Sequence, residues 1–113
     1  MDRLLRRQDF LAAARGPSRA KTGCVVQMRA RLDEGPARVG FTVTKKLGNA
    51  VARNRIRRRL KEAVRTGLAG RFRPGHDYVL IGRLGTGSRE FSALITDISS
   101  ALDQLHLTET KSQ

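Results

Sequence analysis

The 113-residue sequence is poor in the side chains on which disulfides, metal sites and catalytic centres depend. It has one cysteine, two histidines and no tryptophan. A single cysteine excludes an internal disulfide, and Cys24, His76 and His106 lie too far apart in the chain to form a zinc-ligand motif. We therefore expect no metal or cofactor bound by the protein itself. Because Cys24 precedes Val25 and Val26, we expect it to act as a small apolar side chain.

Long apolar segments are also missing. No run approaches the roughly 18 to 20 apolar residues that a bilayer span needs, and the N-terminus alternates Arg with Leu instead of carrying a signal-peptide block. These features predict a cytoplasmic protein with no membrane partner and no obligate protein partner. The length predicts one domain, residues 1–107, followed by a frayed tail at 108–113.

Recognisable catalytic motifs are absent as well. Asp33 and Glu34 are adjacent but lie in a predicted turn, and the two histidines fall near the ends of predicted elements. No serine lies in a nucleophile-elbow pattern, and Gly85-Thr86-Gly87 lacks the lysine and spacing of a phosphate-binding loop. We therefore predict no catalytic residue in the protein.

Positive charge, by contrast, is abundant. The chain has 23 Lys and Arg against 10 Asp and Glu, a net charge of +13. Residues 45–65 carry nine of these cations and one acid, Glu62, which gives +8 in one short segment. Such a density opposes compaction unless a polyanion neutralises it, and nucleic acid is the obvious candidate.

Apolar periodicity predicts an α+β fold built as a two-layer sandwich in the order α-β-β-(β)-α-β-α. The predicted helices cover residues 4–14, 50–66 and 91–107, and the predicted strands cover 23–32, 38–44 and 78–84. Asp33-Glu34-Gly35-Pro36 is typical of a turn, so we expect the first two strands to pair antiparallel. The apolar strand 78–84 should be interior to the sheet. Each of the first two strands has a more polar face that could stay open to a ligand.

The middle helix is predicted in most detail. Asn49 is a candidate N-cap, Gly67 ends the helix, and Ser88 is a candidate N-cap for the last helix. Ile56, Leu60, Ala63 and Val64 form an apolar stripe, which leaves an outward face rich in arginine. Arginine binds phosphate bidentately, and the free amides of a helix N-terminus also favour phosphate. The helix and the turn before it are therefore predicted to bind nucleic acid.

The segment GNAVARNRIRRRLKE, residues 48–62, resembles the signature of the protein subunit of bacterial ribonuclease P. The similarity extends to Asp9-Phe10, to Val39-Gly40-Phe41 and to the following Val43-Thr44-Lys45-Lys46. It implies a ribosomal protein S5 domain 2-like fold with a left-handed βαβ crossover, a topology that the right-handed rule for such units would not predict.

The resemblance also implies a function. Ribonuclease P removes the 5′ leader from precursor tRNA, and its catalytic RNA holds the Mg²⁺ ions. The implied partners are that catalytic RNA and precursor tRNA, with the leader bound in a cleft by Phe10, Arg29 and Thr42. Ala14 stands where the family often has a second cleft aromatic. The implied contacts to the catalytic RNA are Lys45, Lys46, Asn49, Arg53, Asn54, Arg55, Arg57, Arg58 and Lys61. Arg53 has an alternative role in supporting the fold, because it lies near the apolar stripe.

Two other functions fit parts of the sequence. A structural RNA-binding protein of the ribosomal type would need the same cations, and both kinds of protein would bind RNA with steep salt dependence. A protein nuclease acting alone would need catalytic side chains that the sequence does not offer.

Overall fold

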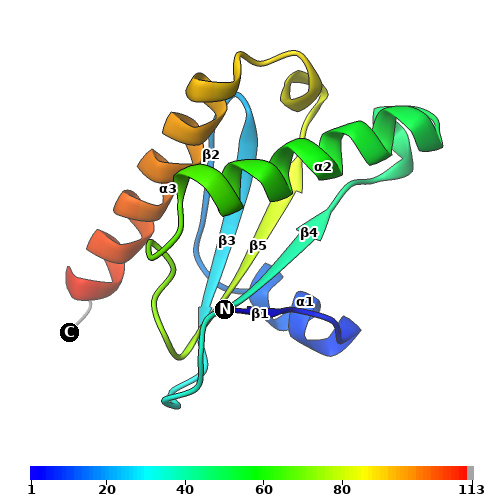
Figure 1. The fold of residues 1–113 in the computed structure, drawn as a ribbon. Coiled ribbons are helices and arrows are strands. Elements are labelled where there is room, and N and C mark those ends of the chain that lie inside the picture. The colour runs from blue at the N-terminus through cyan, green and yellow to red at the C-terminus, as the bar shows by residue number, and fades with distance from the viewer. Residues whose placement is uncertain (112–113) are drawn as a thin grey trace.

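The computed structural model describes residues 1–111, which form a five-stranded mixed sheet with three α-helices (Figure 1). The strands are β1 (Asp2–Arg3), β2 (Ser18–Ala20), β3 (Cys24–Ala30), β4 (Arg38–Thr42) and β5 (His76–Gly82). The helices are α1 (Arg7–Ala14), α2 (Ala50–Gly67) and α3 (Phe91–Lys111), with short 3-10 helices η1 (Lys45–Leu47) and η2 (Leu84–Gly87). The predicted α+β class is confirmed.

The sheet has the strand order β1-β4-β5-β3-β2. The apolar β5 is interior to the sheet, as predicted, because a strand that is apolar on both faces is best buried in the middle. The predicted hairpin between β3 and β4 is wrong, since β5 lies between them, antiparallel to β3 and parallel to β4. The edge strands β1 and β2 were not predicted, because two or three residues are too short to show a periodicity.

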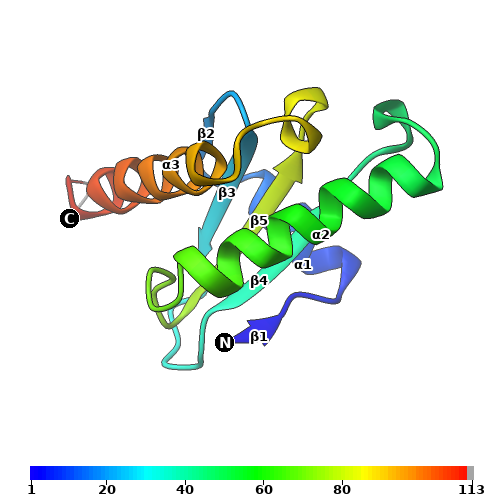
Figure 2. The same cartoon turned by 45° about the horizontal axis from the view of Figure 1, so that its top comes forward.

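The elements form three layers (Figure 2). α2 and α3 lie on one face of the sheet and share the main core with Val26, Met28 and Leu80. α1 lies on the opposite face, where Phe10 and Ala13 pack near Val79. The predicted two-layer sandwich therefore describes only the side that carries α2 and α3, and the sheet face expected to stay open is partly covered.

α2 follows its prediction closely. The Asn49 side-chain oxygen accepts the Ala52 N–H at 2.9 Å, which confirms the N-cap. The helix runs to Gly67, and its predicted apolar stripe, Ile56, Leu60, Ala63 and Val64, is buried. Gly48, just before the cap, has φ +124°, a conformation that other residues rarely adopt. The chain therefore needs glycine to turn from η1 into α2.

The ends of α1 and α3 differ from the prediction. Residues 4–6 are not helical, because the Leu4 N–H donates to Val39 and extends the pairing of β1 with β4. Ser88 is not the cap of α3; the Glu90 carboxylate accepts the N–H groups of Ser92 and Ala93 instead.

The predicted end of the last helix at residue 107 is wrong, because α3 continues to Lys111. Two contacts hold this last part of the helix. Thr108 accepts a hydrogen bond from Arg19 at 2.9 Å, and Glu109 bonds His76 at 2.7 Å. Residues 112–113 lie outside the described part of the chain.

Candidate nucleic-acid interface

The predicted interface begins in the segment that joins β4 to α2. Lys45 and Lys46 were expected at a strand end, but β4 ends at Thr42 and both lysines lie exposed in η1. Asn49 is also exposed, and its side chain is engaged in capping α2. η1 therefore places two cations beside the amides of the first turn of α2, a combination that favours an anion.

The outward surface of α2 continues this charge. Asn54, Arg58 and Lys61 are exposed, and Arg57 is half-buried while it donates to Asn54 at 3.2 Å. These four residues and Glu62 line one shallow hollow of about 490 Å³. Four of the predicted contact residues thus share one surface. They lie together because side chains three and four residues apart project from the same side of a helix.

The arginines on the two flanks of α2 behave differently. Arg55 is exposed and lines a hollow shared with Leu84 and Ser88. Arg59, by contrast, donates to the carbonyls of Thr86, at 3.1 Å, and Arg89. Its guanidinium also lies 5.7 Å from the centre of the Phe91 ring. Arg59 therefore connects α2 to η2, and its guanidinium is engaged in contacts within the protein.

Arg53 lies at the border between the apolar stripe and the outward surface of α2. The residue is half-buried, and its Nε is buried without a hydrogen-bond partner among residues 1–111. This placement agrees with its position near the apolar stripe.

The three residues predicted for a cleft lie on the sheet face that carries α1, since Arg29 contacts Asp9 and Thr42 pairs with Ile81, which packs in the same cluster as Phe10. Phe10 packs so tightly on Gly40 that a Cβ there would lie 2.6 Å from its ring. Phe10 also shares a pocket of about 110 Å³ with Arg3, Arg57 and Lys61, so the predicted cleft and α2 adjoin. No sequence pattern grouped Arg3 with these residues, because β1 was not predicted. Thr42 is half-buried opposite Ile81 and does not line this pocket.

Arg29 is held in an ion-pair cluster around Asp77. This carboxylate is fully buried on the central strand, and its neighbours across the sheet are Arg29 on β3 and Arg38 on β4. Arg38 donates to it at 2.7 and 2.8 Å, and Arg31 at 2.8 Å; Arg29 approaches to 3.6 Å. Burial alone would raise the pKa of Asp77, but the hydrogen bonds from Arg38 and Arg31 outweigh it and lower that pKa.

Asp9 of α1 joins the same cluster. It lies 3.4 Å from Arg29 and 3.6 Å from Arg38, so the ion pairs attach α1 to β3 and β4. The positive charge of Arg29 is therefore largely compensated by two carboxylates.

The two histidines and the cysteine are engaged in contacts that stabilise the fold. His106 is buried and bonds the Tyr78 hydroxyl at 2.8 Å, and its pKa is lowered to about 4 by burial and then by the nearby charges of Arg73 and His76. Cys24 is fully buried, as expected of a small apolar side chain, and burial raises its pKa to about 12. Thr86, in the predicted turn at 85–87, donates to the Gly23 carbonyl at 2.6 Å.

The described residues offer neither a metal-binding cluster nor a membrane-spanning helix. Within residues 1–111, no three His, Cys, Asp or Glu side chains are grouped closely enough to hold a metal ion. No helix in that range combines the length and apolar character needed to cross a membrane.

Comparison with known proteins decides the family. The family model described as Ribonuclease P matches residues 1–106. The chain belongs to the ribonuclease P protein family. It is thus a protein subunit of the ribonuclease P holoenzyme, a ribonucleoprotein of tRNA processing.

Two curated relatives carry the name ribonuclease P protein component. The one from Ruegeria pomeroyi is 53% identical over 107 residues, which covers 91% of this chain and 85% of the relative. The one from Caulobacter vibrioides is 51% identical over 105 residues, which covers 92% and 70%.

Solved ribonuclease P proteins have the same fold. The Staphylococcus aureus protein superposes with a TM-score of 0.74 at 26% identity, covering 91% of this chain and 94% of that one. The Thermotoga maritima protein gives 0.72 at 28% identity, covering 93% and 96%. The resemblance read from residues 48–62 is confirmed.

Proposed function

We propose that this protein binds the catalytic RNA of ribonuclease P and helps it remove the 5′ leader from precursor tRNA. The observation that carries this proposal is the cationic surface formed by η1 and α2. Its proposed contacts with the catalytic RNA are Lys45, Lys46, Asn49, Arg53, Asn54, Arg55, Arg57, Arg58 and Lys61, which are exposed or half-buried. The apolar stripe of the same helix is buried, so RNA can bind the outer surface without disturbing the core.

We assign leader binding to the side of the molecule that carries α1. Phe10 supplies an aromatic ring there, and Arg57 and Lys61 line the same pocket and can pair with phosphate. Thr42 and Arg29 remain weaker candidates, Arg29 because its charge is already paired with Asp9 and Asp77. The Mg²⁺ ions of the reaction are assigned to the catalytic RNA, and the protein aids their use by neutralising RNA phosphates.

The finer topology and location are part of the same proposal. We infer that the β4-α2-β5 crossover is left-handed, as in the ribosomal protein S5 domain 2-like fold. Figure 1 supports this handedness, because α2 passes in front of the sheet and the parallel strand β5 follows to the left of β4. We place the holoenzyme in the cytoplasm.

Reconstitution with the catalytic RNA at low Mg²⁺ tests the function. The measurement compares the affinities of precursor tRNA with a long leader and of leaderless tRNA, with and without the protein. We expect the protein to raise affinity for the long-leader substrate alone. Equal gains for both RNAs would contradict leader binding.

Arg58→Ala tests the α2 surface. Arg58 is exposed and lies off the apolar stripe, so the variant should lose affinity for the catalytic RNA while its unfolding free energy changes by less than about 0.5 kcal/mol. Arg15→Ala is a suitable control, because it removes an exposed arginine after α1, outside the proposed surface. Equal losses of RNA affinity in the two variants would indicate a general charge effect.

A further inference from the structure

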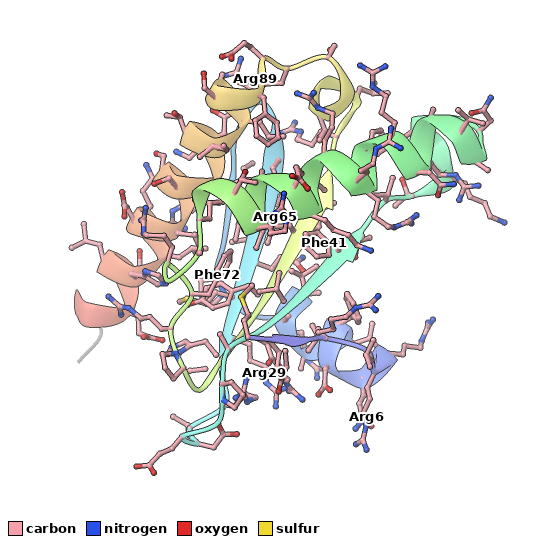
Figure 3. All side chains as sticks on the ribbon, in the orientation of Figure 1. Arg6, Arg29, Phe41, Arg65, Phe72 and Arg89 are labelled. Carbon is pink, nitrogen blue, oxygen red and sulfur yellow. The ribbon has the colours of Figure 1, made fainter. Side chains whose placement is uncertain are left out.

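A second hollow lies on the other side of β4 from Phe10. It has a volume of about 390 Å³ and lies between β1, β4 and α2. This volume is within the roughly 300–1,000 Å³ of typical small-ligand pockets. Val39, Phe41 and Val64 form its apolar lining, and Figure 3 places Phe41 and Arg65 in the region between β4 and α2.

The hollow adjoins the proposed leader pocket and shares Arg3, Val39, Phe41 and Lys61 with it, but it extends over the α2 face of the sheet because side chains alternate along β4. Gly40 faces α1 and contacts Phe10, whereas Val39 and Phe41 on either side of it belong to the core beneath α2 and α3. β1 pairs with β4 only at Arg38 and Val39. Phe41 lies two residues further along β4, past the end of this pairing, and it stays half-buried.

The rim of the hollow is cationic. Arg3 comes from β1, and Lys61 and Arg65 come from successive turns of α2. The Lys61 Nζ lies 6.0 Å from the centre of the Phe41 ring. Asp2 also lines the hollow, and Arg65 pairs with Glu62, so the rim retains a positive excess from Arg3 and Lys61.

An aromatic ring on an apolar floor with cations around it matches the chemistry of an unpaired nucleotide. The base can stack on or contact the ring, and the phosphate can reach the guanidinium and ammonium groups at the rim. We propose that this hollow binds one unstacked nucleotide of an RNA, with the base against Phe41 and the phosphate between Arg3 and Lys61. The proposal rests on the proposed function for the kind of ligand, but its test needs no catalytic RNA.

The test uses the full chain and adenosine 5′-monophosphate as the probe. NMR signals of the Val39 and Val64 methyl groups are followed during the titration, with Val79 on the opposite sheet face as the reference. Ribose 5-phosphate is the matched ligand without a base. We expect adenosine monophosphate to shift Val39 and Val64, and ribose 5-phosphate to leave them nearly unchanged. Equal effects of the two ligands, or no shift with either, would overturn the proposal.

Two matched variants locate the base. Phe41→Leu removes the ring from the hollow, and Phe91→Leu removes a ring that faces a cation elsewhere, at 5.7 Å from Arg59. We expect Phe41→Leu to weaken adenosine monophosphate binding about fivefold or more, the effect of losing one base-aromatic contact, and Phe91→Leu to leave it unchanged. Equal affinities in the two variants would refute the role of Phe41. Should Phe41→Leu fail to fold, the comparison of the two ligands on the unaltered protein still decides.

The outcome is distinguishable from a failure of the proposed function. If Arg58→Ala reduces binding of the catalytic RNA while adenosine monophosphate binds without a base effect, the nucleotide site is wrong and the α2 surface stands. If adenosine monophosphate binds as expected while Arg58→Ala keeps full affinity for the catalytic RNA, the nucleotide site stands and the assignment of the α2 surface is wrong.

Discussion

Asp77→Asn is the substitution for which the structure allows the fullest prediction. One carboxylate oxygen of Asp77 accepts from Arg38 Nε at 2.7 Å and from Arg31 at 2.8 Å, and the other accepts from Arg38 Nη2 at 2.8 Å. Asparagine has nearly the same shape, so it creates no cavity. It keeps an oxygen for two of the donors but turns an amide nitrogen toward the third, and it leaves the arginines without the charge that neutralises them.

The size of the effect follows from these contacts. A hydrogen bond to a charged group contributes about 1 kcal/mol more than a neutral one, and an unsatisfied buried donor costs about 1–3 kcal/mol. Two weakened bonds and one lost bond give about 3–5 kcal/mol, the range measured when one partner of a buried ion pair is removed. Since small domains have about 5–15 kcal/mol of stability in all, this is a large fraction.

Urea unfolding followed by circular dichroism measures the change. Asp33→Asn is the matched control, because Asp33 also accepts two hydrogen bonds from Arg31, both at 3.0 Å, but is exposed. We expect a much smaller change for Asp33→Asn, since exposed ion pairs contribute little. A loss below about 1 kcal/mol for Asp77→Asn would refute the idea that the buried carboxylate holds the strands together.

The same carboxylate predicts a pH dependence. Its pKa is lowered in the folded protein, because the bonds from Arg38 and Arg31 outweigh burial, which acts in the opposite direction. Its stabilising contribution is therefore complete above the unfolded pKa of about 3.9 and is lost as the pH falls through the lower folded pKa. Asp77→Asn should flatten the fall in unfolding free energy below about pH 4. An unchanged slope would contradict this assignment.

Three further predictions concern other parts of the core. Arg59→Ala should lower the unfolding free energy by about 1–3 kcal/mol, because it removes bonds to Thr86 and Arg89 and the contact with Phe91; an effect as small as that of Arg58→Ala in urea unfolding would contradict its structural role. Leu60→Ala should cost about 2–5 kcal/mol in the same assay, since Leu60 is fully buried in the stripe of α2, and a change under about 1 kcal/mol would argue against that packing. His106 has a pKa of about 4, below its ordinary 6.5, so its contribution is present above pH 6.5 and declines toward pH 4; His106→Gln should reduce the pH dependence of urea unfolding in this window, and an unaltered profile would count against it.

The α2 region could be predicted from the sequence in detail. The N-cap at Asn49, the end at Gly67 and the buried stripe from Ile56 to Val64 were predictable, because capping and helical periodicity are local properties. The interior position of β5 was predictable for a similar reason, since its apolar residues need cover on both faces. The motif at residues 48–62 then led to the family.

Which side chains contact one another depends on the arrangement of distant segments in space. Local turn chemistry at residues 33–36 suggested a hairpin, but β5 enters between β3 and β4 and brings Asp77 between Arg29 and Arg38. The Arg59 side chain likewise points toward η2 because it binds the carbonyls of Thr86 and Arg89, which lie about thirty residues further along the chain. The hollow at Phe41 exists because a two-residue strand from the N-terminus ends beside it. Strand order and side-chain partners arise from contacts between distant segments, so no local pattern encodes them.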